Sequence, residues 1–267
     1  MKPYALDVAI ALAIQRAALG AVDAPNSARR GVVYAVVGAA FVWRCYPAVF
    51  VLAGASIALG VSAIRRRHGA AAFGRLALVS LVWACSFAGL YWVTSKANVS
   101  SEHLQDFWLH SRASWPASSK ALSWYVERYF EVFHDPVGFN QSALAAAAAI
   151  VGVAIVGRRS LSRIVILLLP VALTLVASRL GKYPFSSRLV LFLVPSALLL
   201  TAAGLDELRR IPGKAIWFAV AAFVLLFQPA VAAISEARHP RVREEIRPVL
   251  QDLVSRVKPG DAVYVYE

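Results

Sequence analysis

Charged residues are scarce in this sequence. They make up 16% of the 267 residues, against 59% that are hydrophobic, and the mean hydropathy is +0.62. A soluble domain of this length carries more charge, so the composition excludes an ordinary soluble protein. The apolar runs are rich in Ala, Leu and Val and do not alternate with polar residues, as barrel strands would. Composition therefore predicts an all-α, polytopic transmembrane helical bundle.

Motifs of familiar soluble active sites are missing as well. The sequence holds no Gly-rich phosphate loop, no zinc-type cluster and no nucleophile elbow. Its two cysteines, Cys45 and Cys85, lack metal-ligand spacing such as Cys-x-x-Cys, so we expect small apolar packing residues at both positions. No small-residue cleavage pattern follows the first apolar stretch, which argues against a signal peptide.

Acidic residues are few: 15 Asp and Glu face 28 Lys and Arg, which gives a net charge of +13 and a pI near 10.3. In a soluble chain this excess would indicate a nucleic-acid partner. Here most cations lie next to apolar runs, where they orient helices and meet lipid headgroups. We therefore expect membrane lipid as the partner and no nucleic acid.

Apolar runs predict about eight membrane segments, each near the length that crosses the bilayer. They cover residues 5–19, 31–42, 48–64, 76–94, 142–156, 164–177, 189–205 and 215–234. Tyr46-Pro47 reads as a turn between two spans, because a residue before proline avoids the α region. The predicted organisation is a transmembrane domain over 1–235, with one large loop at 95–137, and a soluble tail over 236–267.

Basic clusters predict the orientation. Short loops rich in Arg and Lys face the cytoplasm, and alternation along the chain brings all the short basic turns to that side. These turns contain Arg29-Arg30, Arg65-Arg66-Arg67, Arg158-Arg159-Arg163 and Arg209-Arg210-Lys214. The large loop and the tail are then extracytoplasmic, and the Ala- and Arg-rich composition indicates a bacterial inner membrane. The N-terminus falls on the outer side.

The loop and the tail carry local patterns of their own. Residues 121–130 have apolar side chains at helical spacing and predict an interfacial amphipathic helix with its aromatic side toward the lipid. In the tail, apolar residues recur at helical spacing from Val242 to Val257, and Ala262–Tyr266 has strand propensity. Since a lone strand cannot pair with itself, we expect either that the tail is the beginning of a small α/β domain or that its last strand pairs with a partner.

Polar residues at the outer ends of the predicted helices are the candidate site. The candidates for binding an anionic ligand are Tyr4, Asp7, Arg44, Tyr46, Lys182, Tyr183 and Arg188, with Lys2 nearby. Arg and Lys can hold a phosphate group, although cations and aromatics at a helix end are also typical membrane anchors. Arg179 is interpreted as such an anchor. Asp7 stands out because a carboxylate inside an apolar span is costly.

Short motifs in these regions resemble the C-type (GT-C) glycosyltransferase superfamily, in particular its bacterial protein-mannosyltransferase-like members. Residues 2–8 resemble the Lys-x-Tyr-x-x-Asp start of one of their membrane helices, and Trp43–Phe50 resembles their Trp-x-x-Tyr-Pro-Ala junction. Tyr183–Arg188 is similar to the late outer loop whose arginine approaches the carrier phosphate. Residues 247–266 resemble the entry into their outer soluble domain.

The resemblance implies an enzyme that takes a sugar from a polyprenyl-phosphate carrier, with a divalent metal possible. It implies Lys182 and Arg188 at the phosphate, Tyr183 and Tyr46 lining the cavity, and Asp7 orienting nearby cations. The family's catalytic carboxylate lies in a first outer loop that precedes the region matched here. We therefore expect the later part of such an enzyme, with the catalytic residue unknown; candidate substitutes are Asp7, Asp106 and Asp135.

A second hypothesis is a non-enzymatic membrane scaffold or a transporter-like bundle. A transporter needs a polar path through the membrane. The predicted spans carry few ionisable residues besides Asp7, which counts against transport.

Overall fold

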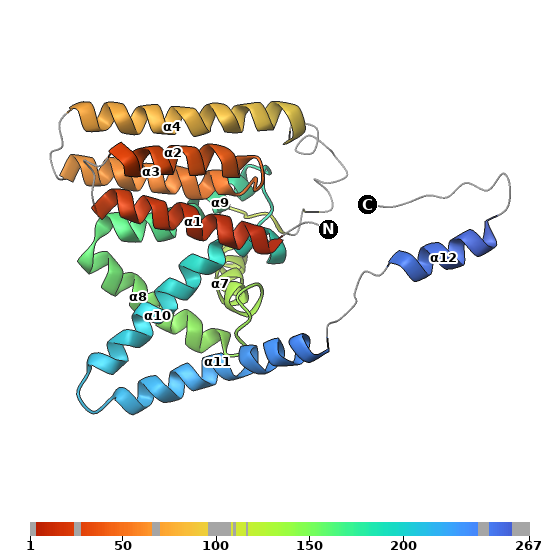
Figure 1. Cartoon of the computed structure of the whole chain (residues 1–267). Helices are drawn as coiled ribbons and strands as arrows, with labels where there is room; N and C mark the ends of the chain where they lie inside the picture. The colour runs from red at the N-terminus through yellow and green to blue at the C-terminus, as the bar shows by residue number, and fades with distance from the viewer. Residues whose placement is uncertain are drawn as a thin grey trace. The chain divides into compact units, whose positions relative to one another are not determined.

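A computed structural model describes residues 4–23, 28–65, 70–95, 108, 111–115, 117–239 and 246–257. These residues are helical with short connections, and they contain no strand, which confirms the all-α class. The helices, shown in Figure 1, are α1 (Tyr4–Asp23), α2 (Ala28–Val42), α3 (Ala48–Arg65), α4 (Ala70–Leu90), the π-helix η1 (Tyr91–Ser95), α7 (Ser119–His134), α8 (Ser142–Arg159), α9 (Leu161–Arg179), the 3-10 helix η3 (Ser187–Leu193), α10 (Val194–Arg210), α11 (Ala215–Arg238) and α12 (Ile246–Arg256).

Seven helical segments of the described residues are long and apolar enough to cross a membrane. The shorter helix over Gly31–Val42 lies between the first two. The long ones match the predicted segments in position, because helix formation in an apolar run depends mainly on local hydropathy. Trp43–Pro47 forms the predicted turn, with the Cys45 amide bonded to the Phe41 carbonyl at 2.9 Å.

The first packing group consists of α1, α2, α3, α4, α9 and η3. In Figure 1 the helices α1 to α4 run alongside one another. Their shared core includes Ile10, Ile14, Tyr34, Leu52 and Phe192, each 1% exposed or less. Within this group, Gly54 of α3 packs against Pro170 of α9. A Cβ at Gly54 would lie 2.9 Å from the proline ring. Glycine therefore sets the approach of these two helices.

The second packing group is built on a close crossing of α8 and α10. A Cβ at Gly152 would collide with the Leu200 carbonyl, and a Cβ at Gly204 would collide with the Ala148 carbonyl. Small residues let two membrane helices approach at backbone distance, which van der Waals packing rewards. The Tyr129 hydroxyl of α7 donates to the Ala146 carbonyl of α8 at 2.7 Å, so α7 is attached to this group.

The amphipathic helix predicted at 121–130 is confirmed as part of α7, and Ser118 caps it by accepting from the Ala121 amide. Its predicted orientation is only partly right. Trp124 packs edge-on to Phe185, with ring centroids 6.5 Å apart, and Phe133 is 3% exposed. These rings therefore face the protein, whereas Phe130 is exposed.

The chain divides into two units, 1–226 and 227–267, and the division falls inside α11. The second unit contains the last part of α11 and the whole of α12. The helix α12 confirms the prediction of a helix from the helical spacing between Val242 and Val257. The strand expected at 262–266 lies outside the described residues.

Two ends of the bundle can be told apart in Figure 1. The carboxyl ends of α3, α8 and α10 lie together on the left of the view. They carry the basic residues Arg65, Arg158, Arg159, Arg209 and Arg210. The alternation on which the predicted orientation rests is therefore present in the fold, since each span returns the chain to the opposite end.

Candidate functional site

The connection from α9 to η3 is the centre of the candidate site. The end of α9 is closed by backbone bonds, with the Gly181 amide donating to Ser178 and the Lys182 amide donating to Ala177, at 3.0 and 2.9 Å. Gly181 has a φ of +66°, a left-handed conformation that terminates helices and that glycine adopts without strain. The chain can therefore turn sharply at the carboxyl end of α9.

A second segment, residues 111–115, is bonded onto this connection from far away in the sequence. The Ala113 amide donates to Ser178 Oγ at 3.1 Å, and the Phe185 amide donates to the Ser111 carbonyl at 3.0 Å. The Tyr125 hydroxyl of α7 donates to the Ser114 carbonyl at 2.6 Å. These bonds hold the segment against the end of α9, so its side chains have a defined place.

The two segments enclose a polar pocket of about 510 Å³, which we call the cationic pocket. It is lined by Arg112, Ala113, Ser114, Trp115, Arg179, Leu180, Gly181 and Lys182. The Arg179 guanidinium lies 5.1 Å from the Trp115 ring centroid, a cation–π distance. Gly181 lies next to Arg112, since a Cβ at Gly181 would be in ordinary contact with the guanidinium at 3.5 Å.

Three cations therefore share one concave surface. Among the described residues that line the pocket there is no carboxylate. Two guanidinium groups and an ammonium group in such an arrangement offer forked donors and a point charge, which suit a phosphate or another oxyanion.

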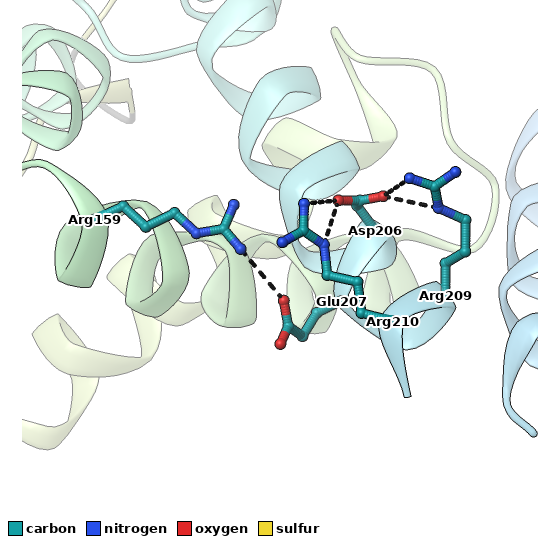
Figure 2. A network of polar contacts seen from close by, with 5 residues as sticks. All are labelled: Arg159, Asp206, Glu207, Arg209 and Arg210. Atoms are coloured by element: carbon teal, nitrogen blue, oxygen red, sulfur yellow. Dashed lines mark hydrogen bonds and ion pairs between the residues drawn. The ribbon is translucent and has the colours of Figure 1, made fainter. Parts of the chain in front are cut away.

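The cations at the other end of the bundle are arranged differently, as Figure 2 shows. Arg209 and Arg210 both point at the Asp206 carboxylate, with Nε to oxygen distances of 3.1 and 2.9 Å, and Arg159 reaches Glu207 at 3.7 Å. These cations have carboxylate partners supplied by α10 itself. The arrangement fits a solvated helix end rather than a ligand site.

The aromatic candidates lie on the protein side of the connection. Tyr183 is 7% exposed and its hydroxyl donates to the Leu189 carbonyl at 2.7 Å. Its ring stacks on Tyr46 at 6.2 Å and meets Phe50 edge-on at 5.3 Å. Tyr183 is therefore a core residue and does not line the cationic pocket. Tyr46 is half-buried in the same aromatic group, and burial raises the pKa of its phenol.

Asp7 lies against Cys45. The Cys45 thiol is 2% exposed and hydrogen-bonds the half-buried Asp7 carboxylate. Burial, and then the charge of Asp7, raise the pKa of this thiol. The bond that the structure describes for Asp7 is thus to a thiol, not to the cations that Asp7 was expected to orient. Cys45 packs in the core as predicted, whereas Cys85 is exposed on α4.

The remaining candidates do not join the cationic pocket. Arg44, on the turn before α3, and Arg188, in η3, are exposed, and neither lines the pocket that contains Lys182. Lys2 and the side chain of Tyr4 lie outside the described residues. The pocket thus combines Lys182 with Arg112 and Arg179, in place of the expected pair of Lys182 and Arg188.

Asp135 is one of two described carboxylates, with Glu131, that line a small hollow beside the connection. Its Oδ2 accepts from Ser187 Oγ at 2.6 Å, at a serine whose φ is +35°. Asp106 lies outside the described residues. Among the residues searched there is no group of three His, Cys, Asp or Glu side chains, so the described residues do not fit a divalent metal, and we derive no step through one.

Buried polar side chains of the described residues are neutral. They are Gln15, Ser62, Ser162, Thr174, Ser178, Ser196 and Thr201, with Gln15 donating to Ser196 Oγ at 2.8 Å across the bundle. Ionisable side chains inside a membrane mark ion and proton pathways, and the fully buried side chains of the described residues include no Asp, Glu, His, Lys or Arg. The scaffold or transporter-like alternative stays a prediction.

Sequence reasoning missed Arg112 and Ser114, and it assigned Arg179 to the membrane surface. The local run from Ser111 to Trp115 does mix a cation with an aromatic ring. Nothing in it indicates a partner 65 residues away, because the bond of Ala113 to Ser178 is made by tertiary folding. The signal that could have helped is Gly181, since a glycine that ends a helix beside a cation marks a close approach.

Comparison of the chain with protein-family models, with curated proteins and with solved structures finds no match. The likeness to the C-type glycosyltransferases therefore rests on the short motifs of the sequence alone.

Proposed function

We propose that this chain binds the phosphate of a polyprenyl-phosphate-linked sugar in the cationic pocket, as the carrier-binding part of a C-type glycosyltransferase in a bacterial inner membrane. The observation that carries the proposal is the convergence of Arg112, Arg179 and Lys182 on one pocket at the end of α9. The pocket lies beside Tyr183–Arg188, the connection that resembles the carrier loop of that superfamily. The large loop and the tail are then extracytoplasmic.

The charges suit this ligand. A phosphate held by two guanidinium groups and an ammonium group makes charge-assisted hydrogen bonds, which are stronger than neutral ones. The long apolar tail of a carrier would remain in the bilayer, so the phosphate would reach the protein at the membrane surface where α9 ends. The bonds of Ala113 and Phe185 hold together the two backbone segments that carry the donors, which lowers the ordering cost of binding.

Sugar transfer additionally needs a base for the acceptor hydroxyl. Asp135 is a described carboxylate adjacent to the connection, and Asp7 is engaged with Cys45. The binding proposal does not require either residue to be catalytic, and the base can come from outside the described residues.

The test is the binding of undecaprenyl phosphate to the purified full chain in lipid nanodiscs, followed by sugar transfer in proteoliposomes. Arg112→Gln and Lys182→Gln each remove a charged hydrogen bond and should weaken binding roughly tenfold or more. Arg209→Gln is the matched control, because its guanidinium is held by Asp206 at the other end of the bundle. Equal affinities for the wild type and both pocket variants would overturn the proposal.

Arg188→Gln separates the pocket from the family motif. Because Arg188 does not line the pocket, its replacement should leave phosphate affinity unchanged. A large loss at Arg188 together with none at Arg112 would move the phosphate site to the connection itself.

A further inference from the structure

A second cavity lies against α7, and its lining is mostly apolar, unlike that of the cationic pocket. We call it the apolar cavity. It measures about 230 Å³ and is walled by side chains of α7, α8, α9 and α10, among them Val132, Val153, Leu168, Val171 and Ala197. These helices, α7 excepted, are long enough to cross a membrane. A cavity of this lining takes hydrocarbon and excludes water.

One cation stands where the apolar lining ends. Arg128 of α7 lines the apolar cavity and also an adjoining small hollow with Glu131, Asp135 and Ser187. Its guanidinium pairs with Glu131 and lies 5.7 Å from the Trp124 ring centroid. Arg128 Nε is enclosed and has no hydrogen-bond partner among the described residues. A buried donor without a partner costs free energy. The Arg128 side chain as a whole is 26% exposed, so a ligand oxygen can still reach the guanidinium.

The charges of this hollow differ from those of the cationic pocket. One cation and two carboxylates line it, so its net charge is negative. A purely anionic headgroup would be repelled by Glu131 and Asp135. The hollow itself measures about 10 Å³, so a headgroup would lie over its mouth. A headgroup with both a phosphate and an ammonium group would there place its phosphate near Arg128 and its ammonium near the carboxylates of Glu131 and Asp135.

We propose that the apolar cavity holds an acyl chain of a zwitterionic phospholipid with a primary ammonium headgroup, and that Arg128, Glu131 and Asp135 hold this headgroup. Phospholipid surrounds the helices that form the walls, so the occupant is present at high concentration. The lipid fastens α7 to the bundle, because Arg128, Tyr129 and Val132 of α7 all line its site. The inference does not depend on the carrier proposal.

The test uses the purified full chain and native mass spectrometry, with phosphatidylethanolamine and phosphatidylglycerol of identical acyl chains added in equal amounts. Phosphatidylethanolamine should be retained about tenfold more, because its ammonium replaces repulsion by attraction. Equal retention, or preference for phosphatidylglycerol, would overturn the proposal.

Two variants on α10 test the cavity itself. Ala197→Phe fills the cavity and should lower phosphatidylethanolamine retention about tenfold. Ala202→Phe adds the same ring at an exposed position of the same helix and should leave retention unchanged. Equal retention in both variants would contradict a chain inside the cavity.

A headgroup variant keeps the test decisive if Ala197→Phe does not fold. Glu131 is partly exposed and pairs with Arg128 across one helical turn, so Glu131→Gln should fold normally. It should reduce the preference for phosphatidylethanolamine over phosphatidylglycerol severalfold, because one carboxylate is lost. An unchanged preference would remove the headgroup assignment.

Discussion

The two basic regions at opposite ends of the bundle use the same residue types in opposite ways. At the end of α10, Arg209 and Arg210 share Asp206, and Arg159 reaches across to Glu207 (Figure 2). At the end of α9, Arg112, Arg179 and Lys182 line a concave surface together. The difference teaches that a basic helix end does not by itself indicate a ligand site: the cations at the end of α10 lie against carboxylates, whereas those at the end of α9 line one pocket without a carboxylate among its described lining residues.

The largest expected effect concerns the crossing of α8 and α10, the two helices whose ends carry the ion pairs of Arg159, Arg209 and Arg210; we call this end the paired region. Gly152→Ala or Gly204→Ala adds a Cβ against a facing carbonyl, so α8 and α10 must separate. We expect a loss of about 2 kcal/mol or more in the free energy of unfolding, since overpacking forces the backbone to shift. Thermal unfolding in detergent measures it.

Gly74→Ala is the control for this crossing. A Cβ there meets no atom within 4 Å, and the position lies in an exposed part of α4. It should be neutral or raise stability by about 0.5 kcal/mol, because alanine is the better helix former. Similar losses at Gly152 and Gly74 would mean that the crossing is not close.

The next effect compares two glycines that both have positive φ. Gly181 lies in the cationic pocket at φ +66°, and Gly213 lies in the turn between α10 and α11 at φ +76° with open space around it. Alanine at either position should cost about 1 kcal/mol from the left-handed backbone. Only Gly181→Ala should weaken binding of undecaprenyl phosphate, because Gly181 lines the cationic pocket beside Lys182 and Gly213 does not. Measuring the free energy of unfolding and the affinity for undecaprenyl phosphate for both variants tests this difference. A loss of affinity in Gly213→Ala as well would show that the affinity does not depend on the cationic pocket.

A smaller effect concerns the thiol behind the connection. Burial and the charge of Asp7 raise the pKa of Cys45, so the folded thiol stays protonated where an ordinary thiol, near pH 8.5, ionises. In a Cys85→Ser background, iodoacetamide should label Cys45 slowly at pH 9 and rapidly after denaturation. The free energy of unfolding should fall as the pH rises above 8.5, because the unfolded chain then loses a proton that the folded chain keeps. Fast labelling of the folded protein would contradict the burial of this thiol.

The smallest effect belongs to the paired region. Arg209→Gln removes one of two guanidinium groups from an exposed carboxylate, and Arg210 still holds that carboxylate. Exposed ion pairs contribute little to stability. The melting temperature should therefore change less than for either replacement of a positive-φ glycine, and a larger change would show that this network stabilises the fold.

Most helices could be predicted from the sequence, and the reason is local. A run of apolar residues must satisfy its own backbone in a bilayer, so hydropathy and length suffice to find it. The same holds for the turn at Tyr46-Pro47 and for α7, whose apolar positions recur at helical spacing. The side of α7 that faces the protein could not be predicted, because Trp124 faces a core formed with Phe185, a residue 61 positions later in the chain.

The site was predicted in part. Lys182 lines the cationic pocket. The sequence predicts a binding role for it because it is a cation at the end of an apolar run. Tyr183, one residue later, turns into the core, since successive residues of a tight connection point in different directions. Because Lys182 and Tyr183 are neighbours in the same motif, the sequence could not show which of them faces the pocket and which faces the core.

The sequence by itself determined the class of this protein, its helical segments and the alternation of basic turns, because these depend on composition and on neighbours along the chain. Only the tertiary structure decided which cations share a pocket. Arg112 and Lys182 line one pocket because the Ala113 amide donates to Ser178 Oγ and the Phe185 amide donates to the Ser111 carbonyl. Contacts between distant segments depend on helix packing, which no local pattern records.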